Sequence, residues 1–162
     1  MDNAIVNKGA IILAESEVFS SLKNLNIENC GIMPAGVLAL AKSASLKNLE
    51  EIILNKNDIK DKGSQHLAAS QNFAKLKSLK ASDVSVGDLA VKTLVLSQNL
   101  KNLEELHLNG NSMTREGLEF LQDTPNLCAL KKIDLRRNGF LYEDCIFPSD
   151  SPRFKNLEVV RF

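Results

Sequence analysis

Tryptophan is absent from this chain of 162 residues, and only one tyrosine and three cysteines are present. Because tryptophan and tyrosine are the usual anchors of protein interfaces, few large aromatic contacts are available to a partner. The cysteines, Cys30, Cys128 and Cys145, are odd in number and include no close pair. A disulfide framework is therefore not expected, and a reducing cytoplasmic environment fits this composition.

The sequence also lacks long apolar runs and an excess of either charge. No run approaches the roughly 18 apolar residues that span a bilayer. The apolar stretch near the N-terminus, about six residues long and preceded by Asp2, is too short for a signal peptide. Lysine plus arginine and aspartate plus glutamate number 20 each. Nucleic-acid binders and polybasic membrane binders need excess positive charge, so we expect neither kind of partner.

Signatures of catalysis and metal binding are missing as well. The sequence contains no P-loop, no nucleotide-binding glycine fingerprint, no HExxH and no CxxC. His66 stands beside the apolar Leu67 on an expected outer helix, where it should face solvent. Enzymes need a nucleophile, a base and an orienting group that converge. We therefore expect no catalysis, no cofactor and no metal.

What is present is a period of 27 residues that runs through the whole chain. One column of the repeat consists of Leu22, Leu49, Leu76, Leu103, Leu130 and Leu157. Further apolar columns follow three and five residues later, beginning at Leu25 and Ile27. A mostly polar column holds Asn3, Cys30, Asn57, Val84, Asn111 and Asn138, and a glycine column begins at Gly9, Gly36 and Gly63. Each unit thus reads LxxLxLxxNxΦxxxGxxxL.

The physics of one unit predicts a strand, a turn and a helix. The LxL segment alternates like a strand, and the segment after the glycine has apolar residues at helical spacing. We expect strands near 25–27, 52–54, 79–81, 106–108, 133–135 and 160–162, and helices near 8–17, 35–44, 62–71, 88–97 and 115–123. A unit of this size cannot bury a core alone, so the units must stack. Strands stack closer together than helices, which places the strands inside a curved arc.

This pattern resembles the ribonuclease-inhibitor-like class of leucine-rich repeats over essentially the whole chain. The resemblance implies an α/β solenoid, a short right-handed horseshoe with about six parallel strands on the concave face and about five helices on the convex face. It implies one domain over 1–162, with a partial unit at 1–21 and units that start near 22, 49, 76, 103, 130 and 157. It also implies that the concave face or its edges bind another protein.

The asparagine column has a physical reason of its own. After each strand the chain turns and leaves backbone groups in the interior, which an amide side chain can satisfy as both donor and acceptor. Asn111 should therefore contribute to stability.

The pattern breaks in two places. In the unit that begins at Leu76, alanine and valine occupy the third leucine and asparagine positions, at Ala81 and Val84. This indicates either a turn reshaped for a partner or neutral drift with a looser core. The stretch 141–153 contains two prolines where a helix is due. Its aromatic residues either anchor a partner or fill the space of the missing helix.

Candidate partner contacts lie at the variable strand positions and the turn positions that follow. They are Glu28, Ile53, Asn55, Lys56, Lys80, Glu105, His107, Asn109, Lys132, Asp134, Arg136, Arg137 and Arg161. Positive residues gather toward the C-terminal end of this face. They either engage an acidic partner or simply keep the solenoid solvated.

The leading hypothesis is a monomeric module that binds a protein of unknown identity. The style of the repeats fits a bacterial eukaryotic-like effector, which would act in the host cytosol. The alternatives are a regulator of a small GTPase or another enzyme, since Ran GTPase-activating proteins share this repeat type, and a sensor fragment of a larger receptor.

Overall fold

The computed structural model describes residues 6–123, 126–141, 144 and 156–162, and the fold is built from short repeated elements. Its strands are β1 (Asn24–Asn26), β2 (Glu51–Ile53), β3 (Ser78–Lys80), β4 (Glu105–His107), β5 (Lys132–Asp134) and β6 (Val159–Arg161). Its α-helices are α1 (Val6–Glu15), α2 (Pro34–Lys42), α3 (Lys60–Ala69), α4 (Asp88–Val95) and α5 (Arg115–Asp123). Two 3₁₀ turns, η1 (Glu17–Phe19) and η2 (Gln71–Phe73), precede β1 and β3.

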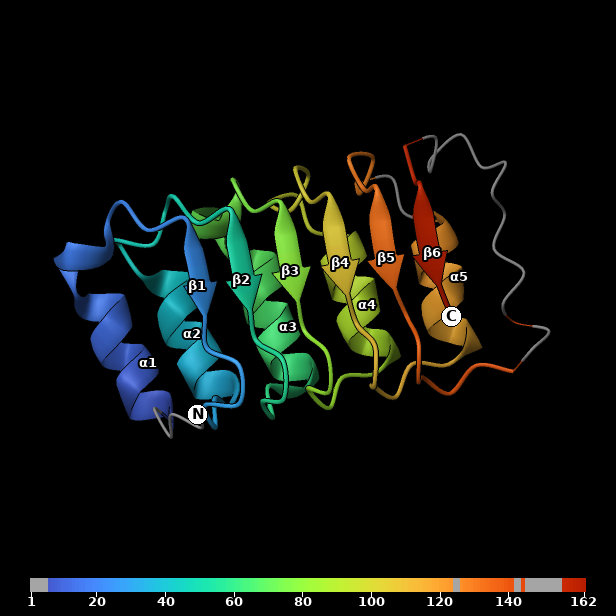
Figure 1. The fold of residues 1–162 in the computed structure, drawn as a ribbon, viewed down its shortest axis with the longest axis horizontal. Coiled ribbons are helices and arrows are strands. Elements are labelled where there is room, and N and C mark those ends of the chain that lie inside the picture. The colour runs from blue at the N-terminus through green and yellow to red at the C-terminus, as the bar shows by residue number, and fades with distance from the viewer. Residues whose placement is uncertain (1–5, 124–125, 142–143, 145–155) are drawn as a thin grey trace.

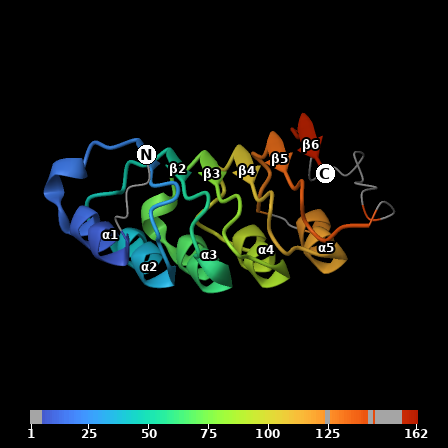
Figure 2. The same ribbon diagram turned by 60° about the horizontal axis from the view of Figure 1, so that its bottom comes forward.

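The six strands form one parallel sheet in chain order, β1 to β6. Neighbouring strands pair with a constant offset of 27 residues, so Leu25 faces Ile52 and Ile52 faces Leu79. The helices lie together on one side of the sheet (Figure 1), and they are spaced more widely than the strands (Figure 2). The predicted α/β solenoid of parallel strands and outer helices is therefore confirmed, with the strands on the inner side.

The observed elements differ from the predicted ranges by one or two residues. Each strand begins and ends one residue earlier than predicted, because the second leucine of the unit lies at its centre rather than its start. The third apolar residue still extends the ladder, since the amide of Ile27 donates to the carbonyl of Ile53 at 3.0 Å. Helices α1 and α3 begin two residues earlier than predicted, and α4 and α5 begin where predicted.

The core lies between the sheet and the helices. Leu49, Leu76, Leu103 and Leu130 are at most 1% exposed. The glycine column has a steric reason: a Cβ at Gly63 would lie 2.8 Å from the Cβ of Ile59, so a larger residue would push the helix away. Close packing thus explains the glycine at this position, while α4 accepts Ala90 at the equivalent position.

The degenerate third unit keeps the register of the others, but its turn differs, because Ser85 has a φ of 61° and the equivalent Asp58 and Ser112 have no positive φ. Ala81 is 1% exposed and Val84 is fully buried, and β3 keeps its register with both neighbours. In the second break, only Leu141 and Asp144 lie among the described residues, so both readings of 141–153 fall outside them. None of the described helices is long and apolar enough to cross a membrane.

Candidate functional site

The asparagine column ties each turn to the turn of the preceding unit. The Nδ2 of Asn57 donates to the carbonyls of Ile27 and Leu54 at 2.9 and 2.7 Å. Its Oδ1 accepts the amides of Cys30 and Ile32 at 3.1 and 2.9 Å. The predicted role of the column is confirmed, but each asparagine bridges two units rather than serving only its own.

Bridging explains how this column tolerates residues other than asparagine. The amides of Val84 and Val86 donate to Oδ1 of Asn111 at 3.0 and 3.3 Å. The turn of the third unit is therefore satisfied from the fourth. The turn that contains Cys30 is satisfied in the same way by Asn57.

A second set of ladders joins the helix C-termini, and the sequence reasoning missed it. The buried hydroxyls of Ser43, Ser70 and Ser97 donate to the carbonyls of Ala14, Ala41 and Ala68 at 2.6 to 2.7 Å. Two residues later, the amide groups of Asn72, Asn99 and Asn126 also donate to carbonyls of the preceding unit. The sequence carries this signal as S-x-N-Φ at 70–73 and again 27 residues later at 97–100, a polar pattern that the apolar columns of the repeat do not predict.

All the candidate contact residues lie on the strands or on the turns directly after them. The central column of the inner face is Ile53, Lys80, His107, Asp134 and Arg161, which pair as neighbours across β2 to β6. Glu105 and Lys132 form part of the column that opens the strands, and Glu28, Asn55, Asn109 and Arg136 form the column after them. The structure therefore brings the predicted residues into adjacent rows of one surface, called the inner face below.

Lys56 and Arg137 occupy a special backbone position just beyond this face. The column Asn29, Lys56, Asp83, Gly110 and Arg137 has positive φ angles between 52° and 70°. Glycine and asparagine are the residues that enter this region most readily. Gly110 leaves open the space through which the guanidinium of Arg137 reaches Asp83, two units away, at 3.0 Å.

The charges of the inner face are paired among themselves. Lys80 contacts Glu51 at 2.6 Å, Lys132 lies 3.9 Å from Glu105, and Lys56 contacts Glu28 at 2.8 Å. Arg136 and Arg137 pair with Asp134 and Asp83. Of the cations at the C-terminal end of this face, Arg161 alone makes no ion pair with a described residue, so the positive residues that the sequence places there are largely paired with carboxylates.

Asp134 is the most constrained of these groups. It is only 2% exposed, and Arg136 clamps it with Nε to Oδ1 at 2.9 Å and Nη2 to Oδ2 at 2.6 Å. The side-chain bond from Arg136 lowers the pKa of Asp134 below its ordinary value. This carboxylate is therefore ionised and fixed in position at neutral pH.

His107 lies beside this pair and is half-buried. Burial lowers its pKa, and the positive charge of Lys132 lowers it further. Its Nε2 is 3.5 Å from Glu105 and makes no hydrogen bond with a described residue. His107 is thus a neutral surface residue at pH 7 rather than a member of a proton-transfer group.

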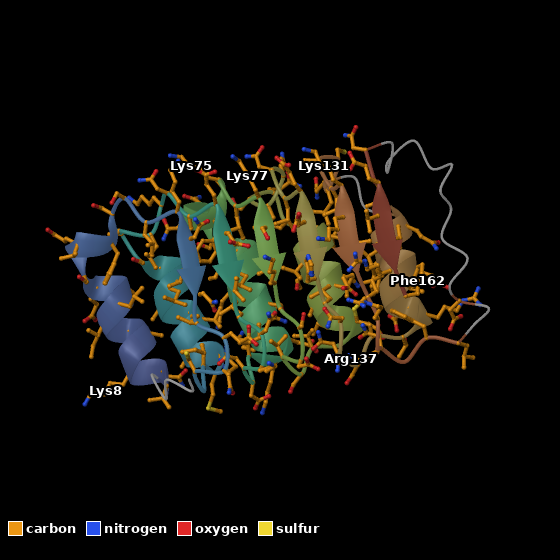
Figure 3. The ribbon with its side chains drawn as sticks, in the orientation of Figure 1. Lys8, Lys75, Lys77, Lys131, Arg137 and Phe162 are labelled. Atoms are coloured by element: carbon orange, nitrogen blue, oxygen red, sulfur yellow. The ribbon has the colours of Figure 1, made fainter. Side chains whose placement is uncertain are left out.

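An alternating ladder of charge follows the edge where the strands begin, and sequence reasoning missed it too. Its members are Lys23, Glu50, Lys77, Glu104, Lys131 and Glu158. Glu50 contacts both lysines beside it, at 3.0 and 2.8 Å, and these contacts lower its pKa to about 2. Figure 3 shows Lys77 and Lys131 along this edge and Arg137 at the opposite edge.

The described residues contain no group of three or more histidine, cysteine, aspartate or glutamate side chains placed to hold a metal ion. What the inner face offers instead is a rigid array of hydrogen-bond donors, acceptors and paired charges.

One family model matches two stretches of the repeat. This model, described as Leucine Rich repeat, matches residues 45–68 and 99–121, two ranges that start two units apart. Among solved structures, the chain is similar to an internalin from Listeria monocytogenes, with 18% identity and a TM-score of 0.48. That match covers 90% of this chain and 49% of the internalin chain, so this chain spans about half its length. No curated protein matches the sequence.

Proposed function

We propose, from the premise that this chain is a leucine-rich repeat protein, that it binds a protein partner through the inner face of its sheet. Solenoids of this kind present an extended surface whose shape is set by the stacking of the units. The partner contacts would come from the central column of the sheet and the turns beside it.

One observation carries this proposal: the backbone repeats, but the side chains of the inner face do not. The central column changes from Ile53 through Lys80 and His107 to Asp134 at equivalent points of the register. The column beside it is apolar and buried in every strand from β1 to β5. Packing thus constrains the second column and leaves the first column free to carry recognition, except at Asp134, which is 2% exposed.

The chemistry of the face indicates the kind of partner. Ile53 and Val159 are the apolar members of the inner-face columns, and most of the charges are paired. Such a surface suits a polar partner of mixed charge, with hydrogen bonds that determine specificity more than raw affinity. Because Lys80, Glu105 and Lys132 are partly exposed, they remain able to exchange their internal partners for external ones.

The test compares two double variants as baits in lysate from the source organism. Lys80→Ala with His107→Ala alters the central column, and Lys62→Ala with Glu116→Ala alters exposed positions on α3 and α5 as a matched control. Captured proteins are quantified by mass spectrometry, and each bait is checked by its urea midpoint.

The proposal predicts that some proteins are captured equally by wild type and by the helix-side control. The central-column variant should capture about tenfold less of the same proteins, which is equivalent to about 1.4 kcal/mol of binding free energy. Equal capture by all three baits, or a loss confined to the helix-side control, would contradict it.

We also propose that the units are of the ribonuclease-inhibitor-like subclass and that the protein works in a cytoplasmic environment, the host cytosol if it is a secreted effector. The 27-residue period supports the subclass, as does the single α-helix between each pair of successive strands from β1 to β5 in the described part of the chain. The odd number of cysteines supports the compartment. Fluorescent tagging in the source organism, and in a host cell if it has one, tests the location.

A further inference from the structure

A surface pocket of about 380 Å³ opens between the C-terminal ends of α1 and α2, away from the inner face. Ile11 and Ala39 form apolar walls, Glu15, Glu17 and Lys42 line its rim, and Ser45 lies in it. Figure 2 shows these two helices side by side at one end of the helix layer.

The pocket lies where the segment that follows α2 departs from the S-x-N-Φ pattern, with serine at position 45 in place of asparagine. Asn72 donates from Nδ2 to the carbonyls of Ala41 and Ser43 at 3.0 and 2.6 Å, and so covers the C-terminal end of α2. Asn99 does the same for α3 at Ala68, at 3.1 Å. Ser45 occupies the equivalent position for α1, and its side chain is too short to reach. The carbonyl of Ala14 still accepts a hydrogen bond from the Ser43 hydroxyl at 2.6 Å, but no amide side chain covers the end of α1 as Asn72 covers the end of α2.

The charges at the C-terminal end of α1 are opposite to those that stabilise a helix. The C-terminal end of a helix carries partial negative charge and favours cations. Helix α1 has no basic residue in its last turn and ends on Glu15, and Glu17 follows directly. Neither carboxylate makes an ion pair with a described residue. This helix end therefore lacks the asparagine found in the next two units and carries two carboxylates where cations are favoured. Functional sites often combine such departures from the rules for stability.

Lys42 is the one cation on the rim. Its charge also acts on His66 of α3, whose pKa burial lowers most and Lys62 and Lys42 lower further. The pocket as a whole therefore combines two carboxylates, a helix C-terminus and a single ammonium.

We propose that this pocket binds the guanidinium group of an arginine side chain presented by a protein partner. A guanidinium offers five donors in a plane and is weakly hydrated, so it can meet the carboxylates of Glu15 and Glu17 while its stem packs on Ile11 and Ala39. An ammonium has a compact, strongly hydrated charge and suits the apolar walls less well. The pocket is separate from the inner face, so this inference does not rest on the proposed function.

The experiment titrates isotope-labelled protein with N-acetyl-arginine methylamide and follows backbone amide resonances by NMR. N-acetyl-citrulline methylamide, which has the same shape without the charge, is the matched control ligand. The key variant is Ser45→Asn, which supplies the residue that caps the next two helices and should fill the pocket without loss of stability. Glu15→Gln with Glu17→Gln is a second variant that keeps the shape and removes the charge.

The proposal expects saturable shifts in residues 14–17 and 43–45 with the arginine probe, and about tenfold weaker binding of the citrulline probe. Ser45→Asn and the double glutamine variant should each weaken arginine binding by a similar factor. The absence of a saturable shift would overturn the proposal, as would equal binding of the two probes. Unchanged arginine binding in the double glutamine variant would also overturn it, even if Ser45→Asn failed to fold.

Discussion

At the scale of single residues, the polar side chains inside this protein serve the backbone. Asn57, Asn111 and Asn138 each satisfy carbonyls in two successive units, and the buried serines satisfy helix ends in the same way. A buried backbone group left without a partner costs about 1–3 kcal/mol. These residues are therefore structural even though they are polar.

Asn111→Ala should lower the free energy of unfolding by about 1–3 kcal/mol. The variant removes the donor to the carbonyls of Ala81 and Leu108, both at 2.9 Å, and the acceptor for two amides of the third unit. Urea unfolding measures the change. Asn109→Ala is the matched control, since its side chain accepts a single bond from the Ser82 hydroxyl. A midpoint for Asn111→Ala equal to that of the control would refute the account.

Arg136→Ala should destabilise the protein more than Arg137→Ala. Arg136 satisfies a carboxylate that is 2% exposed, and its loss should cost about 1–3 kcal/mol. The partner of Arg137, Asp83, is about one-third exposed, and an exposed pair contributes about 0–1 kcal/mol.

The difference in stability between wild type and Arg136→Ala should also depend on pH. The folded pKa of Asp134 is lowered, so its contribution is present above its unfolded pKa, near 4, and is lost as pH falls through the folded value. Urea midpoints at neutral and acidic pH should therefore converge for wild type and Arg136→Ala. A constant gap would show that the ion pair is not its source.

At the scale of elements, the C-terminal end of each of the helices α1 to α4 accepts hydrogen bonds from side chains of the following unit. Asn72→Ser would give the junction of α2 and α3 the chemistry found between α1 and α2. It removes bonds to the carbonyls of Ala41 and Ser43 and should cost about 0.5–1.5 kcal/mol for each. Gln71→Ser, at the exposed neighbouring position, is the control. Equal urea midpoints for these two variants would show that the cap contributes nothing.

The alternating charge ladder makes a prediction about acid. The pKa of Glu50 is lowered from 4.5 to about 2 by Lys77 and Lys23. Its contribution is therefore present above pH 4.5 and is lost as pH falls toward 2. Wild type should lose stability across this window more steeply than Glu50→Gln, and added salt should narrow the difference because the ladder is exposed. Parallel pH profiles would rule out this role for Glu50.

At the scale of the whole molecule, the period in the sequence predicted the architecture because packing repeats with the backbone. The leucine columns fixed the register, and the glycine column marked close packing such as that at Gly63. Strand limits were one residue late, since hydrogen bonding begins before the leucine that signals the strand. The serine ladder was visible in the sequence, but its chemistry depends on which carbonyls lie nearby.

The charge of the inner face could not be predicted in the same way. Arg137 pairs with Asp83, which lies 54 residues earlier in the chain. This pairing depends on the positive φ angles of the turns and on the absence of a side chain at Gly110, neither of which the charge pattern reveals. Arg136 is neutralised by Asp134, which lies only two residues earlier but is almost fully buried. Column positions alone therefore suggested a basic surface where the structure has a paired one.

Hydrogen exchange on a complex with a captured partner tests the central claim, that the inner face is the recognition surface. The account predicts slower exchange at residues 51–56, 78–83 and 105–110, which span β2 to β4 and their turns, with α3 and α4 unchanged. Slower exchange confined to the helices, with these strands and turns unaffected, would contradict it.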